Sequence, residues 1–153
     1  MNPMQDFKVV RVLSPDAIVD DGAYTTTAID TKGFDYCNII VDIGPTDIAM
    51  TALSVQQSED NGSSDSYADV TGLVVGTSLN IDGTASALPS ATDDHKFVVF
   101  DIDCQKTERY LKLVGNAGNG SAGTYLCAIG LLSRAKEVPV TVAGRGADEV
   151  LRI

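Results

Sequence analysis

Apolar and polar residues alternate with a period of two along most of this chain, and almost no stretch repeats at the helical period of 3.6. In residues 36–43 the pattern places Cys37, Ile39 and Val41 on one face and Asn38 on the other. Such alternation is typical of strands with one face on a core and one face in water. Alternation or short apolar runs predict further strands at residues 7–13, 24–30, 53–56, 73–75, 97–103, 109–113 and 125–132.

Turn-forming residues separate these runs, at residues 14–16, 20–22, 44–47 and 60–64. Only residues 46–50 predict a helical turn, capped by the first or second residue of that segment. The 153 residues suffice for one domain. We therefore predict an all-β protein, a single antiparallel β-sandwich or jelly roll. The side chains expected in its core are those of Cys37, Ile39, Val41, Val55, Val98, Phe100, Ile102, Leu111 and Leu113.

The composition divides the chain into an N-terminal arm at residues 1–6, a sandwich at residues 7–133 and a C-terminal tail at residues 134–153. The tail carries a net charge of +1, against −11 for the preceding residues, and is rich in valine. Two interpretations of the tail remain open. It docks on a neighbouring subunit or on a protein shell, or it is a frayed terminus. The residues expected to dock are Val138, Val140, Val142, Arg145, Leu151 and Ile153.

The net charge of the whole chain is −10, and the acids are concentrated. Between Leu13 and His95 there are fourteen carboxylates and one base, Lys32. Because nucleic-acid binders need basic surfaces, we expect no DNA or RNA partner. No apolar run approaches the ~20 residues of a membrane-spanning helix, so no membrane partner is expected either. The first six residues lack the pattern of a secretory signal, which favours synthesis in the cytoplasm.

The three cysteines lie far apart in the sequence and include no closely spaced pair. An odd number cannot all pair within one chain, and metal sites use closely spaced ligands. We therefore expect three free, mostly buried thiols, no stable disulfide and no metal site.

Three segments resemble functional motifs only in composition. His95, the only histidine, lies in a polar stretch, whereas a catalytic base must be buried and oriented. The glycine-rich residues 115–120 precede a strand pattern rather than the helix of a phosphate site, which predicts a hairpin loop. Residues 59–65 lack the ligand spacing of a calcium loop, although such acidic loops can bind calcium adventitiously. We expect no enzyme activity, no catalytic residue and no cofactor.

Two predicted strands are apolar on both faces, although a sandwich strand with one face in water should alternate. They are residues 97–100 and 126–132, and their outward side chains need a second cover. This pattern predicts a homo-oligomer, which we take to be a trimer, unless the arm or tail of the same chain covers them. The residues expected at the interface between copies are Phe97, Val99, Ile129 and Leu131.

A succession of segments resembles a known family. It comprises residues 33–44, the 53–60 strand with its Gly/Ser loop and residues 67–72, and the 108–114 strand followed by a glycine-rich loop and an apolar closing strand. This succession resembles the small jelly-roll head decoration or cement proteins, minor virion structural proteins of tailed bacteriophages. The resemblance covers residues 22–133, with Tyr67 at a position where Trp is more frequent.

The resemblance implies a non-enzymatic virion structural protein that is made in the host cytoplasm and bound to the outer capsid surface. As a homotrimer it would clamp neighbouring subunits of the major capsid protein. Two alternatives remain open, namely a phage tail or head-fibre component and a carbohydrate-binding β-sandwich module. The chain contains no Trp for stacking on sugar rings, so nothing in the sequence positively favours the last of these.

Overall fold

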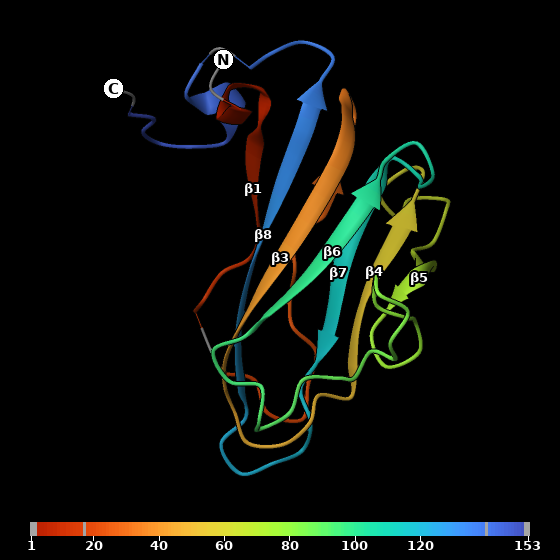
Figure 1. Ribbon diagram of the computed structural model, residues 1–153, viewed down its shortest axis with the longest axis vertical. Coiled ribbons are helices and arrows are strands. Elements are labelled where there is room, and N and C mark those ends of the chain that lie inside the picture. The colour runs from red at the N-terminus through yellow and green to blue at the C-terminus, as the bar shows by residue number, and fades with distance from the viewer. Residues whose placement is uncertain (1–2, 17, 140, 152–153) are drawn as a thin grey trace.

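The computed structural model describes residues 3–16, 18–139 and 141–151, and within them the regular structure is almost entirely β (Figure 1). Two short 3-10 helices, η1 (Pro3–Asp6) and η2 (Ala143–Arg145), flank the strands. The strands are β1 (Lys8–Leu13), β2 (Ile29–Asp30), β3 (Phe34–Thr46), β4 (Ala52–Ser58), β5 (Ala68–Val74), β6 (Phe97–Asp103), β7 (Tyr110–Asn116) and β8 (Thr124–Ala135).

The strands form two antiparallel four-stranded sheets. The first sheet has the order β1-β8-β3-β6 and the second the order β2-β7-β4-β5, so most connections cross from one sheet to the other. This order is that of an eight-stranded jelly roll, in which two Greek keys are wrapped into a sandwich. The prediction of an antiparallel β-sandwich is therefore confirmed.

The long strands β3 and β8 form the centre of the first sheet, and their inward side chains alternate with outward ones. The inward side chains of the two sheets meet in one core. Eight of the nine predicted core residues are buried, whereas Val98, near the start of the edge strand β6, is only partly buried. The sequence pattern thus identified inward residues in four strands, β3, β4, β6 and β7.

The predicted turn at residues 44–47 and helical turn at residues 46–50 are both wrong, because β3 continues through Thr46. The pairing of β3 with β8 shifts register between Ile43 and Thr46. A bulge of this kind admits Pro45, which has no N–H to donate to a neighbouring strand.

Two other connections also differ from the prediction. The loop after β7 is no hairpin, because β7 belongs to the second sheet and β8 to the first. The predicted strand at residues 24–30 is reduced to β2, because the chain crosses between the sheets here. The Thr27 N–H donates to the Val12 carbonyl at 2.9 Å, while the Thr26 hydroxyl donates to the Leu113 carbonyl at 2.6 Å.

The short helices η1 and η2 both lie near the start of β1 (Figure 1). The predicted boundary between sandwich and tail falls inside β8, which continues to Ala135. In the tail, η2 contacts β1, and Gly146 lies so close to the Val9 carbonyl that a side chain there would collide with it. The beginning of the tail is thus docked on its own copy, at the β1 edge of the first sheet.

Candidate interaction surfaces

The outer face of the first sheet carries a row of apolar side chains across three neighbouring strands. Ile40 in β3 pairs with Val99 in β6 on one side and with Ile129 in β8 on the other. Val99 is 52% exposed and Ile129 is 42% exposed, although both lie near the middle of their strands. Groups of exposed apolar side chains in contact with one another usually mark an interface.

Adjacent rows extend this surface. Phe97 is 65% exposed and pairs with Asp42, while the half-buried Leu131 pairs with Val9 and Asn38. The structure therefore brings all four predicted interface residues to one face of one sheet. Sequence reasoning missed two further outward apolar residues, Val9 and Ile40. Counting every second residue along their strands would have found both. We call the following set the apolar face: Val9, Ile40, Phe97, Val99, Ile129 and Leu131.

The apolar face is interspersed with acids rather than bases on its β6 side. Asp42 and Asp101 lie in the rows on either side of the one formed by Ile40 and Val99, and the Asn38 amide donates to the Asp101 carboxylate. A partner for this side of the face therefore has to supply apolar groups and tolerate or neutralise negative charge.

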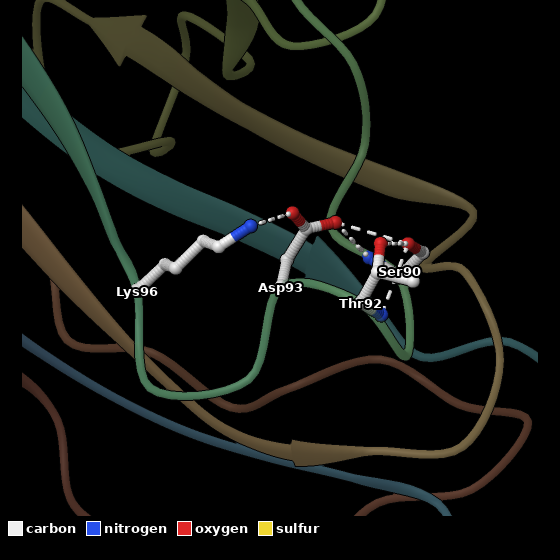
Figure 2. A network of polar contacts seen from close by, with 4 residues as sticks. All are labelled: Ser90, Thr92, Asp93 and Lys96. Atoms are coloured by element: carbon white, nitrogen blue, oxygen red, sulfur yellow. Dashed lines mark hydrogen bonds and ion pairs between the residues drawn. The ribbon is translucent and has the colours of Figure 1, made fainter.

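A polar network of Ser90, Thr92, Asp93 and Lys96 lies in the loop just before β6 (Figure 2). The Asp93 carboxylate accepts bonds from the Ser90 N–H and hydroxyl, both at 2.9 Å, and forms an ion pair with Lys96 at 3.0 Å. These contacts lower the pKa of Asp93, the Lys96 bond most strongly. The neighbouring Asp94 carboxylate accepts the Thr46 N–H at 2.8 Å, so the loop is also attached to the end of β3.

A groove of about 540 Å³ lies beside the apolar face, between β6 and the segment of residues 72–87. Both β5 and β6 are edge strands, because each pairs with only one neighbour in its sheet. A small turn joined by the bridge between Leu79 and Ala85 forms the outer wall of the groove. Leu79 is 66% exposed and Ile81, at the tip, is fully exposed. Phe97 and Val99 line the groove as well as the apolar face.

Of the predicted docking residues of the tail that the structure describes, three are exposed and Arg145 is half-buried. Val138, Val142 and Leu151 all expose large apolar surface, with Leu151 at 91%. Arg145 ends η2, and its guanidinium donates to the Pro139 carbonyl at 2.9 Å. The other two predicted docking residues, Val140 and Ile153, lie outside the described residues.

The motifs considered for catalysis and metal binding have structural explanations. His95 is exposed with a φ of 63°, and its N–H donates to the Ile43 carbonyl at the end of the sandwich. The Asp60 carboxylate accepts the N–H groups of the three residues from Ser63 to Asp65, so the acidic loop is closed by its own backbone. Within the described ranges, no group of three or more His, Cys, Asp or Glu residues could hold a metal ion.

All three cysteines are free in the structure. Burial raises the pKa of the Cys37 thiol to about 12 and that of the Cys104 thiol to about 11, and it also raises the pKa of Cys127. Because the thiolate is the reactive form, a raised pKa makes these thiols less reactive at neutral pH.

The second sheet carries the aromatic side chains relevant to sugar binding. Tyr110 in β7 and Tyr67, just before β5, are half-buried. The Arg109 guanidinium lies 4.8 Å from the Tyr110 ring centroid, and the Lys112 ammonium lies 5.5 Å from that of Tyr67. Cations thus already occupy a face of each ring on which a sugar would stack.

Comparisons with protein-family models, curated proteins and solved structures found no match for this chain. None of the helices in the described part of the chain is long and apolar enough to cross a membrane.

Proposed function

We propose that this chain is a non-enzymatic structural protein of a virion, in which it self-associates through the apolar face and binds the outer surface of the capsid. The observation that carries the proposal is the apolar row formed by Ile40, Val99 and Ile129 on the outside of the first sheet. A chain with a net charge of −10 is otherwise built to remain dispersed, so such a row calls for a specific cover.

The jelly-roll strand order supports the virion assignment, since this architecture occurs in viral capsid proteins. The acidic surface supports a position outside the shell, because packaged nucleic acid would repel it. The resemblance to decoration proteins then names the partner, the major capsid protein, and the arrangement, a homotrimer that clamps neighbouring shell subunits.

Jelly rolls also occur in lectins, which keeps a carbohydrate-binding role as the alternative from another class. The tyrosines of the second sheet are the groups that such a role would use, and cations already occupy them. A tail or head-fibre component is the alternative within virions.

Copy number in purified particles tests the proposal. A decoration protein should be present in hundreds of copies per particle. It should also dissociate from the capsid while the phage tail stays attached. A handful of copies that co-purify with tails would replace decoration with the fibre assignment, and absence from particles would overturn the virion proposal altogether. Binding of the purified protein to a glycan array, without binding to capsids, would establish the carbohydrate alternative.

A further inference from the structure

A second hollow, apart from the groove beside β6, lies at one end of the sandwich. It has a volume of about 470 Å³ and is lined by the turn between β2 and β3, the turn between β6 and β7, and the residue that follows β8. This is the end toward which the arrows of β6 and β8 point in Figure 1. Pockets that hold small molecules have volumes of roughly 300–1,000 Å³, so this hollow, here called the end pocket, is of ligand size.

The end pocket gathers bases on a chain that is otherwise acidic. Three of the eleven bases of the chain line it, Lys32, Arg109 and Lys136, against one acid, Asp35. The Arg109 guanidinium donates two bonds to the Asp30 carboxylate, at 2.8 and 2.7 Å. Neither lysine ammonium forms an ion pair with a carboxylate of the described residues. The two lysines therefore remain available for a negatively charged ligand.

Backbone hydrogen bonds fix the walls of the end pocket relative to one another. The Lys136 N–H donates to the Gly33 carbonyl at 2.8 Å, which ties the end of β8 to the turn that carries Lys32. The Thr31 N–H and hydroxyl both donate to the Arg109 carbonyl, at 3.0 and 2.7 Å. The backbone positions of all three bases are thus set before a ligand arrives, which lowers the entropic cost of binding.

The end pocket also contains a polar group that the protein leaves without a partner. Thr107 lines the pocket, and its Oγ1 is buried and has no hydrogen-bond partner among the described residues. Leaving a buried hydroxyl unpaired costs free energy, so such a group calls for an explanation. A turn about χ1 would direct this hydroxyl into the pocket, where an acceptor oxygen on a ligand would pair with it.

We propose that the end pocket binds the phosphate group of a small molecule. A phosphate carries up to two negative charges and several acceptor oxygens. It therefore suits two ammonium groups and a hydroxyl better than a carboxylate does, with its two oxygens and single charge. The surrounding acidic surface repels a polyanion such as nucleic acid, so the phosphate belongs to a free anion or to a small ester. This site is independent of the proposed self-association.

A titration followed by nuclear magnetic resonance tests the site. Inorganic phosphate, glucose 6-phosphate and acetate are each added to the full chain at neutral pH, with sodium chloride holding the ionic strength constant. We expect saturable shifts of the backbone N–H signals at residues 31–35, 104–109 and 136 with both phosphates, and much weaker binding of acetate. Tighter binding of glucose 6-phosphate than of inorganic phosphate would identify an ester as the ligand, and equal affinity would identify the free anion.

Charge variants test which groups hold the phosphate. Lys32→Gln and Lys136→Gln should each raise the dissociation constant for inorganic phosphate by about threefold to tenfold, between the effect of an exposed ion pair and that of a hydrogen bond to a charged group. Both residues are exposed, so the melting temperature should not change. The matched control is Lys96→Gln, which removes the same charge just before the opposite end of β6 and should leave the dissociation constant unchanged.

Thr107→Val tests the hydroxyl while nearly keeping the shape of the side chain. This variant should also raise the dissociation constant for inorganic phosphate. The melting temperature of the free protein should stay the same or rise, because an unpaired buried hydroxyl is removed. An unchanged dissociation constant would overturn the part given to Thr107.

Two results would overturn the proposal as a whole. The first is the absence of saturable shifts at the end pocket with either phosphate, or acetate bound as tightly as phosphate. The second is an equal loss of affinity in Lys96→Gln, which would show attraction by the overall charge of the chain rather than by the pocket. Light scattering of the same samples reports the oligomeric mass, so self-association is tested separately.

Discussion

Gly130 in β8 faces the core at a point where the second sheet leaves no room for a side chain. A Cβ at this position would lie 3.0 Å from Ile29 Cδ1 of β2, whereas carbon atoms in optimal contact are about 3.5–4.0 Å apart. Ile29 is fully buried and cannot swing into solvent. Gly130→Ala should therefore cost about 1–3 kcal/mol of unfolding free energy, the range seen for overpacked cores.

Shortening Ile29 tests this contact more strictly. Ile29→Val removes the Cδ1 atom and alone should cost about 0.5–1.5 kcal/mol. The double variant combines Gly130→Ala with Ile29→Val. The atoms then nearest to the new Cβ at position 130 are Val12 Cγ2 at 3.5 Å and Cγ1 of residue 29 at 3.8 Å, which are ordinary contacts. The double variant should thus be more stable than the sum of the single effects by about 1 kcal/mol, within the usual range for residues in contact.

The matched control is Gly115→Ala, on the buried face of β7. Its Cβ would lie 3.4 Å from both Met50 Cε and Tyr24 Cδ2, which are wider contacts than the 3.0 Å at Gly130, so the variant should cost clearly less stability than Gly130→Ala. Urea unfolding followed by far-ultraviolet circular dichroism, at one protein concentration for all variants, measures each effect. The packing of β2 against β8 would be refuted if alanine were tolerated equally at both glycines. It would also be refuted if the effects of Gly130→Ala and Ile29→Val on the unfolding free energy simply added.

Three further predictions concern acid stability, thiols and the tail. Backbone N–H bonds lower the pKa of Asp47 and of Asp60, and the bond from Lys96 is the main cause that lowers the pKa of Asp93, each from an ordinary value of 3.8. The stabilisation that these three carboxylates contribute is complete above pH ~4 and is lost as the pH falls through their lowered pKa values, so the melting temperature should drop in that range. Asp47→Asn should make this drop smaller. An unchanged dependence of the melting temperature on pH in that variant would contradict the role given to Asp47. Titration under denaturing, non-reducing conditions should find three free thiols, and one would indicate a disulfide. Deleting residues 147–153 should leave the melting temperature unchanged and weaken assembly. A lower melting temperature with assembly unchanged would show that these residues serve folding instead.

The period of two was enough to predict the strands and the inward side of four of them, because burial on one face imposes that period directly. It also identified Phe97, Val99, Ile129 and Leu131 as outward apolar residues, and the structure places all four on one face. These features are local, since each depends on neighbouring residues along a single strand.

The features that sequence reasoning missed depend on residues far apart in the chain. Gly and Ser residues make the loop after β7 flexible, but nothing in them specifies whether it returns to the same sheet or crosses to the other. Gly44 and Pro45 read as a turn, although pairing with β8 holds them in a bulged strand. The groove arises only when residues 72–87 come to lie beside β6.

Self-association through the apolar face is the central claim, and the mass of the purified protein in solution tests it most directly. Light scattering at micromolar concentration should give a mass near three times 16.1 kDa. Val99→Asp, in the middle of the apolar face and 52% exposed, should shift that mass toward a single chain without unfolding the sandwich. A mass near 16.1 kDa for the unmodified protein would contradict the account.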